Sequence, residues 1–251
     1  MEEKKVVLIT GGAMGQGRAH AYKYAENGFN VVLADMLEPS HEAFKETIAN
    51  CEAKGAKVLA KKANITSTED MEALFASAWE TFGRLDVVIA NAGVINFGYT
   101  WELTDEQVEK VMDINLIGTW RTDKYAAQYM LKQGFGRIIN ISSTNGINTY
   151  YPMCIDYDAS KAALISLTHN LAFEYGPYIN VNAIAPGFIG TDNELDGYDE
   201  EFLKEEQEKI MVNRYGKPEE VAYLVKFLIS DEANFINNTI IRIDGGQKGS
   251  C

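Results

Sequence analysis

The sequence predicts one α/β domain built around a doubly wound parallel sheet with helices on both faces. Three observations predict it: a length of 251 residues, a hydrophobic content of 46%, and short β-branched runs that alternate with longer stretches of helical spacing. A chain of this length with this much apolar material can bury one full core. Strands that are apolar along their whole length suit a parallel sheet that is covered on both faces.

Seven runs are predicted as strands because β-branched residues fill them and turn residues bound them. In chain order they are residues 6–9, 31–34, 58–60, 87–90, 138–141, 181–184 and 240–243. Stretches with helical spacing lie between them and predict helices at about 16–27, 40–54, 68–82, 104–133, 157–175 and 218–230. This alternation predicts a Rossmann fold that spans residues 1–251 as a single domain.

The segment from 188 to 216 breaks the alternation. It is acidic and polar, and it contains one further predicted helix at about 199–211. It follows a strand, at the edge where an open α/β sheet places its ligand crevice. Long connections of this kind are commonly functional, so we favour a mobile lid over the substrate, with a plain surface insertion as the alternative.

Charge and cysteine usage narrow the functional classes. The formal net charge of −13 opposes nonspecific binding to nucleic acid or to an anionic membrane, since both need a positive field. No apolar run approaches the roughly 18 residues of a membrane span, and the N-terminus lacks the pattern of a signal peptide. The three cysteines are far apart and lack metal-ligand spacing. We therefore expect a soluble, cytoplasmic protein that uses neither disulfides nor a metal.

A glycine-rich turn joins the first predicted strand to the first predicted helix. It reads Thr10-Gly11-Gly12-Ala13-Met14-Gly15-Gln16-Gly17. Glycines in this position allow a tight turn and a close approach of the backbone to a pyrophosphate, while the helix N-terminus offers N–H groups and a positive dipole end. The turn therefore predicts a dinucleotide site, and the alternative is a merely tight connection.

The residue that ends the second predicted strand bears on the choice of cofactor. Asp35 lies about 20 residues beyond the glycines, where a carboxylate can accept hydrogen bonds from the adenosine ribose and would repel a 2′-phosphate. The residues that follow, Met36, Leu37 and Glu38, supply no cation. The sequence thus predicts NAD(H) in preference to NADP(H), unless Asp35 only ends a strand, as aspartate often does at turns.

A tyrosine and a lysine open the predicted helix at 157–175. Tyr157 and Lys161 are four residues apart and share one helix face. A nearby ammonium favours a phenolate and is expected to lower the pKa of the tyrosine, which helps it exchange protons. Such a pair is common in helices by chance. Here, however, Ser142 and Ser143 end a strand at the ligand edge, where a hydroxyl can hold a substrate oxygen.

Two further segments belong to the set of candidate cofactor and catalytic residues. Asn91-Ala92-Gly93 ends the fourth predicted strand with small residues that let a cofactor lie close to the backbone. Asn115 falls within the predicted helix 104–133. Its side-chain amide, or a backbone group that it releases from the helical hydrogen bonds, could hold a water next to Lys161.

In this order and over essentially the whole chain, these segments resemble the short-chain dehydrogenase/reductase family. Thr10-Gly11-x-x-x-Gly15-x-Gly17 is similar to its cofactor signature. The resemblance implies a catalytic tetrad of Asn115, Ser143, Tyr157 and Lys161. It implies cofactor contacts from Gly11, Met14, Gly15, Gln16, Gly17, Asp35, Asn64, Ile65, Asn91, Ala92, Gly93, Tyr157, Lys161, Pro186, Gly187, Ile189 and Thr191.

The resemblance also implies a mechanism. Tyr157 would exchange a proton with the substrate oxygen, and Ser143 would orient and polarise that oxygen. Lys161 would bind the nicotinamide ribose and lower the tyrosine pKa, while Asn115 would hold a water that relays protons. The cofactor would supply the hydride.

The sequence departs from the family pattern in four places. Gln16 and Ala90 replace the usual aliphatic residue and asparagine, and Asn64 stands where an aspartate commonly meets the adenine. The stretch between Ser143 and Tyr157 is one residue longer than expected, which leaves Ser142 as an alternative working serine.

The predicted substrate contacts are Ser143, Asn145, Cys154, Tyr157 and Phe188. Other aromatic and apolar residues are expected near them: Tyr150, Tyr151, Met153 and Ile155 between the serine and the tyrosine, and Phe97 and Leu195 on other loops that border the pocket. They favour a moderately hydrophobic ketone or secondary alcohol, although such residues also serve loop packing.

Three other functions or features complete the expectations. A 3-oxoacyl-acyl-carrier-protein reductase is the main alternative, and the acidic chain and Asp35 argue against it. A non-catalytic NAD-binding regulator is a remote alternative, since all four tetrad residues are present. The resemblance further implies a homotetramer or homodimer formed through residues 104–133, 157–175 and the C-terminal segment.

Overall fold

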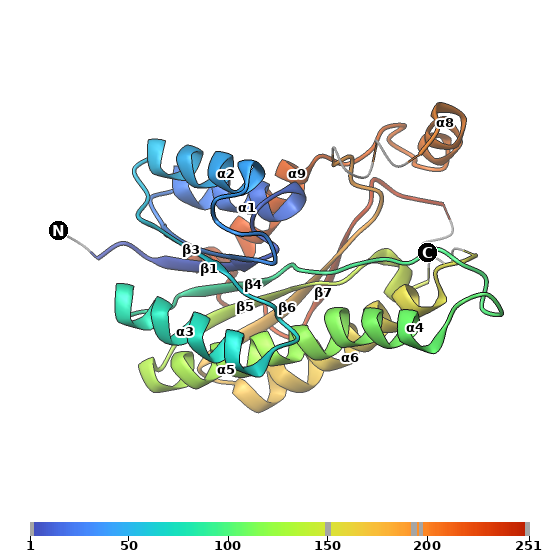
Figure 1. The fold of residues 1–251 in the computed structure, drawn as a ribbon. Helices are drawn as coiled ribbons and strands as arrows, with labels where there is room; N and C mark the ends of the chain where they lie inside the picture. The colour runs from blue at the N-terminus through green and yellow to red at the C-terminus, as the bar shows by residue number, and fades with distance from the viewer. Residues whose placement is uncertain (1–2, 149–151, 192–194, 196–197, 249–251) are drawn as a thin grey trace.

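The computed structural model describes residues 3–148, 152–191, 195 and 198–248. Its centre is a seven-stranded sheet of order β3-β2-β1-β4-β5-β6-β7, in which every pair is parallel (Figure 1). The strands are β1 (Val6–Thr10), β2 (Asn30–Asp35), β3 (Val58–Lys62), β4 (Val87–Ala90), β5 (Gly136–Ile141), β6 (Ile179–Pro186) and β7 (Ile240–Ile243). The predicted fold class is confirmed, and the strand order reverses between β1 and β4, where such folds open a ligand crevice.

Helices cover both faces of this sheet (Figure 1). One face carries α1 (Gly15–Glu26), α2 (Glu42–Ala53) and α9 (Pro218–Leu228). The opposite face carries α3 (Thr68–Phe82), α4 (Asp105–Met112), α5 (Thr119–Gln133) and α6 (Ile155–Tyr175). Two buried apolar clusters correspond to these two layers. No helix in the described ranges is both long and apolar enough to cross a membrane.

Local sequence explains where several helices begin. Thr104 and Gln107 form a reciprocal capping box at the start of α4, and Ser67 accepts a hydrogen bond from the Asp70 N–H at the start of α3. Each such cap satisfies a backbone donor that the first turn leaves without a partner. Pro218 occupies the first turn of α9, where its missing N–H costs nothing.

The long helix predicted at 104–133 is not α-helical along its whole length. After α4 the backbone makes a π-helical turn over Asp113–Gly118 before α5 begins. Such turns insert an extra residue into the helical hydrogen-bond pattern and are frequent at functional sites. The helical stretch predicted at 104–133 is therefore present over residues 105–133, and the π-helical turn within it carries Asn115.

The insertion at 188–216 is closed at its base. Its ends meet in a bridge between Ile189 and Gly216, where the Gly216 N–H donates to the Phe188 carbonyl at 3.0 Å. The helix predicted at about 199–211 is present and shorter, as α8 (Glu200–Glu208), and it projects away from the sheet in Figure 1. This arrangement is compatible with a lid, and mobility of the segment stays a prediction.

Candidate active site

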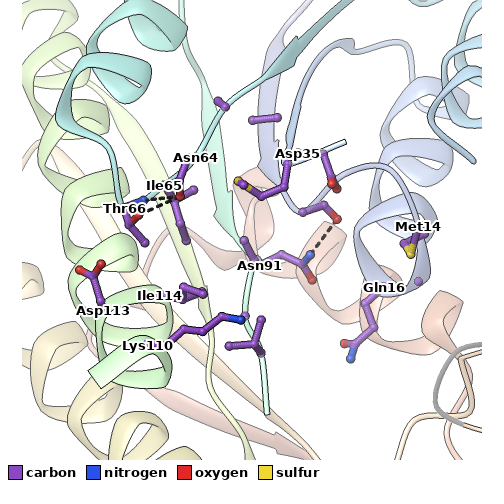
Figure 2. Close-up of a pocket in the computed structure, with 18 of the residues that line it drawn as sticks. Met14, Gln16, Asp35, Asn64, Ile65, Thr66, Asn91, Lys110, Asp113 and Ile114 are labelled. Atoms are coloured by element: carbon purple, nitrogen blue, oxygen red, sulfur yellow. Dashed lines mark hydrogen bonds between the residues drawn. The ribbon is translucent and has the colours of Figure 1, made fainter. Parts of the chain in front are cut away.

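A cavity of about 750 Å³ follows the carboxyl ends of the strands at the reversal point. Figure 2 shows its walls, with Met14 just before α1, Gln16 on α1, Asp35 at the end of β2, Asn64 and Ile65 after β3, and Asn91 after β4. The predicted cofactor residues that line it are Gly11, Met14, Gly15, Gln16, Asp35, Asn64, Ile65, Asn91, Ala92, Gly93 and Thr191. The structure therefore brings together most of the predicted cofactor set, drawn from separate parts of the chain.

The glycine-rich turn is built for close backbone approach. Gly11 and Gly15 have φ of +65° and +55°, a region that side chains rarely adopt. A Cβ at Gly17 would lie 1.9 Å from the Gly11 carbonyl oxygen, so Gly17 acts by packing and does not line the cavity. The Met14 N-cap makes no side-chain capping bond, and the first turn of α1 carries no acidic residue. The backbone N–H groups in the first turn of α1 thus suit a bound anion such as a pyrophosphate.

Asn91 joins the end of β4 to this turn. Its side-chain amide donates to the carbonyls of Thr10 and Gly11 at 3.0 and 3.2 Å. In return the Thr10 hydroxyl accepts from the backbone N–H groups of Asn91 and Ala92 at 3.1 and 3.2 Å. These bonds fix the two strand ends that form the middle of the cavity.

Two polar side chains border the end of the cavity nearest β2 and β3. The Asp35 carboxylate accepts from the N–H of Ala13 at 3.0 Å and from the N–H of Leu37 at 3.1 Å. Each oxygen is thereby held in place while it retains lone pairs for ribose hydroxyls. Asn64 accepts from Thr66, from the N–H at 3.0 Å and from the hydroxyl at 2.9 Å. Asn64 therefore also shapes its own loop.

A second cavity of about 510 Å³ contains the predicted reacting groups, and we call it the catalytic cavity. Ser143, Tyr157 and Lys161 all line it, as do Pro186 and Gly187. The two cavities adjoin because five residues line both, namely Gln16, Asn91, Gly93, Val94 and Thr191. A molecule bound along the first cavity can therefore reach the reacting side chains in the second.

Lys161 is buried in this second cavity. Its ammonium donates to the Ile141 carbonyl at 2.8 Å and lies 5.5 Å from the centroid of the Tyr157 ring. Burial lowers the pKa of Lys161 to about 8, so the group is mostly protonated at neutral pH. The structure thus places a cation beside the tyrosine, as the spacing in the sequence predicted.

Comparison with known proteins gives a consistent result. A family model described as enoyl-(acyl carrier protein) reductase matches residues 11–248. Levodione reductase of Leifsonia aquatica is 38% identical over 98% of this chain and 95% of that protein, and a solved structure of levodione reductase covers 98% of both chains at 35% identity with a TM-score of 0.88. The chain belongs to the short-chain dehydrogenase/reductase family.

Other members of this family are similar to a comparable degree. A Mycobacterium tuberculosis protein named an uncharacterized NAD-dependent oxidoreductase is 36% identical over 96% of this chain and 95% of that protein. A 3-oxoacyl-[acyl-carrier-protein] reductase of Thermotoga maritima is 35% identical over 97% of this chain and 98% of that protein. Identity at this level shows the family and leaves the substrate open.

The geometry separates the two serines that the sequence left as alternatives. The Ser142 hydroxyl donates to the Lys161 carbonyl at 2.8 Å, which ties β5 to α6. The Ser143 hydroxyl accepts from the Asn145 N–H at 3.2 Å and donates to the Asn145 amide oxygen at 3.5 Å. The donated bond is long, so a substrate oxygen in the cavity that Ser143 lines can replace it. This difference favours Ser143 as the family's working serine.

Asn115 is fully buried and acts as a brace. Its amide nitrogen donates to the Val94 carbonyl at 2.8 Å and to the Ser160 hydroxyl at 3.0 Å, and its amide oxygen accepts from the Val94 N–H at 2.8 Å. These bonds position the segment after β4 against α6. The carbonyl of Asn115 accepts from the Thr119 hydroxyl at 2.8 Å, and the predicted relay water stays a prediction.

The predicted substrate contacts are only partly assembled. Asn145 donates to the Asp158 carboxylate at 2.7 Å. It lines a third cavity, which we call the outer cavity, and it contacts Ser143 without lining the catalytic cavity. Cys154 precedes α6, is buried, and has a thiol pKa raised to about 11 by burial. It lines neither cavity of the site. Ile189 is likewise buried, as expected for a residue that contributes its backbone.

Further residues fall on either side of the catalytic cavity. Phe97 lines it, whereas Met153 and Ile155 line the outer cavity. Phe188 lies behind the wall, against Tyr198 and Tyr215. Tyr150 and Tyr151 lie outside the described residues.

Four residues that line the catalytic cavity were not among the predicted site residues: Val94, Ile95, Ile141 and Tyr198. Val94 and Ile95 directly follow Asn91-Ala92-Gly93, so proximity to that motif was an available signal. Tyr198 lies in an acidic stretch with no motif, and only tertiary packing brings it to the cavity.

Proposed function

We propose that this protein is an NAD(H)-dependent oxidoreductase that interconverts a secondary alcohol and a ketone. One observation carries the proposal: Tyr157, Lys161 and Ser143 line one cavity, which adjoins a cavity that has the size and the glycine-rich turn suited to a dinucleotide. Family membership supports the general oxidoreductase activity.

The side chains divide the chemistry of the substrate oxygen. Bound NAD(H) would supply or accept the hydride. Tyr157 would donate its phenolic proton to the carbonyl oxygen in reduction and accept the hydroxyl proton in oxidation. Ser143 would donate a hydrogen bond to the same oxygen and orient it, while the buried Lys161 ammonium stabilises negative charge that develops on the tyrosine.

The preference for NAD(H) over NADP(H) is part of the proposal. Asp35 lines the cofactor cavity beside Met36, and Lys62, on the adjacent strand, is paired with Glu38 at 2.7 Å. A 2′-phosphate there would meet a carboxylate without an unpaired cation beside it. A relative named as NAD-dependent agrees with this preference.

Reduction of acyl-carrier-protein thioesters is the alternative that a relative's name favours. Against it, α8 follows the cavity-lining Tyr198 closely in sequence and carries the exposed acidic residues Glu200, Glu201, Glu205 and Glu208. An acidic carrier protein would be repelled by such a surface. A cytoplasmic location is also proposed, supported by two free, buried thiols at Cys51 and Cys154.

The test is to follow NADH and NADPH oxidation with ketones, quinones, steroids and 3-oxoacyl thioesters. We expect NADH-dependent turnover of neutral ketones, which Tyr157→Phe abolishes while NADH binding, measured by fluorescence, is retained. Tyr178→Phe, at an exposed tyrosine outside both cavities of the site, is the matched control and keeps full activity. Faster turnover of the carrier-protein thioester with NADPH would favour the alternative, and binding without any turnover would favour a regulator.

A further inference from the structure

Five aromatic side chains pack in a continuous cluster beside the catalytic cavity. Tyr198 is central: its ring centroid lies 4.6 Å from Phe202, 5.9 Å from Phe188 and 6.1 Å from Phe97. Phe188 in turn lies 4.6 Å from Tyr215. We call these five residues the aromatic cluster. It links the segment after β4 to both ends of the 188–216 insertion.

Two members of the aromatic cluster form part of the cavity wall. Phe97 and Tyr198 line the catalytic cavity together with Tyr157 and Ser143. Phe97 is 53% exposed, so part of its ring is open to a ligand in the cavity that it lines. Tyr198 is stacked on Phe202 with an interplanar angle of 23°, so its ring is held as a fixed, flat surface.

The same wall is poor in charge. Lys161 is the one cationic side chain among the described residues that line the catalytic cavity, and it already donates to Ile141. The three cations of the insertion do not line the catalytic cavity: Lys209 pairs with Glu206, Arg214 pairs with Glu220 at 2.7 Å, and Lys204 lies on α8. The stretches 149–151 and 192–197 contain no Lys or Arg in the sequence. A buried anionic substrate would therefore lose hydration without gaining a partner, which costs several kcal/mol.

We propose that the substrate is an uncharged, ring-bearing ketone or secondary alcohol whose ring packs against Tyr198 and Phe97, with Tyr198 as the residue that sets this specificity. The proposal rests on the proposed function and adds its substrate class. Fixed aromatic faces bind a flat, rigid ring well because both surfaces meet over a wide area. An open chain of equal size must also give up torsional freedom on binding.

The first arm of the test compares four substrates with NAD(H): cyclohexanone, 2-hexanone, 4-oxocyclohexanecarboxylate and 5-oxohexanoate. We expect kcat/KM for cyclohexanone to exceed that for each of the others by about tenfold or more. Tyr198→Ala should lower the ratio of cyclohexanone to 2-hexanone by about tenfold, whereas Tyr198→Phe keeps it. Tyr223→Ala, at an exposed tyrosine on α9, is the control and leaves the ratio unchanged.

The second arm measures binding without turnover. Cyclohexanecarboxamide should bind the NADH-loaded protein about tenfold more tightly than heptanamide, and Tyr198→Ala should remove the difference. Circular dichroism and NADH affinity show whether Tyr198→Ala is folded, and the wild-type comparisons hold even if it is not.

The two arms separate failure of this inference from failure of the proposed function. Turnover that depends on Tyr157 but favours an open-chain or charged substrate overturns the inference alone. Absence of turnover on the whole panel argues against the proposed function, and in that case equal binding of the two amides overturns the inference as well.

Discussion

The Lys161 ammonium lies 5.5 Å from the centroid of the Tyr157 ring, and the space next to it is kept open by a glycine. A Cβ built on Gly93 would lie 3.4 Å from the Lys161 nitrogen and 3.2 Å from the Asn115 amide oxygen. The distance to Asn115 is shorter than ordinary van der Waals contact and the distance to Lys161 is at its lower limit, so the backbone at Gly93 is part of the packing that positions these two groups.

Gly93→Ala should therefore impair catalysis more than folding. The added methyl group must displace Lys161 or Asn115, and we expect kcat to fall by about tenfold, because a small misplacement of a reacting group is costly. Steady-state kinetics with NADH and thermal unfolding measure the two effects.

Gly134→Ala is the control, and it should lower stability without lowering kcat. Gly134 has φ of +83° and open space around its Cβ position, so alanine there should lower the free energy of unfolding by about 1 kcal/mol and leave kcat unchanged. Equal loss of kcat in both variants would contradict the role given to Gly93.

The sequence predicts the fold well because the alternation of apolar strands and helices is a long-range pattern. It does not predict the π-helical turn at Asp113–Gly118, since a shift of one backbone hydrogen bond leaves no periodic signal over six residues. Motifs located the reacting groups. Ser143 closely follows β5, and Tyr157 and Lys161 lie on α6, so the predicted strand and helix place them in space. Tyr198 and Cys154 lie in loops, where tertiary packing alone decides which side chain reaches the cavity.

Asp35 and Met36 should together control cofactor choice. Asp35→Asn removes the charge and keeps oxygen and amide groups at the site, so the NADH-to-NADPH ratio of kcat/KM should fall by about tenfold. Adding Met36→Arg, at a residue that is 59% exposed and lines the cavity, supplies a partner for the 2′-phosphate and should reverse the preference.

Met36→Lys in the Asp35→Asn background tests whether charge alone is sufficient. A ratio that stays at the wild-type value in all of these variants would show that Asp35 only ends β2.

His20 should make the protein less stable in acid. It is fully buried on α1, neither ring nitrogen has a hydrogen-bond partner, and burial lowers its pKa to about 3. The unfolded chain, with a histidine pKa of about 6.5, takes up the proton first, so stability is lost as the pH falls from about 6.5 towards 3. The loss approaches about 1.4 kcal/mol per pH unit in that window.

His20→Leu removes this titration, and urea unfolding at pH 7.5, 5.5 and 4.5 measures its contribution. We expect the variant to lose less stability than the wild type between pH 7.5 and 4.5. Parallel curves for wild type and His20→Leu would refute the assignment.

Self-association through α5 and α6 is the remaining expectation. Phe173 on α6 is 81% exposed, and Trp120 on α5 is 41% exposed; covering a side chain such as Phe173 contributes roughly 1.5–3 kcal/mol. We expect a homodimer or homotetramer by light scattering, and Phe173→Glu should shift it towards the monomer because a carboxylate would be buried in the interface. Phe135→Glu, at a residue that is 44% exposed beside β5, is the matched control and leaves the assembly intact. A wild-type protein that stays monomeric at micromolar concentration, or a Phe173→Glu variant that assembles like the wild type, would exclude this interface.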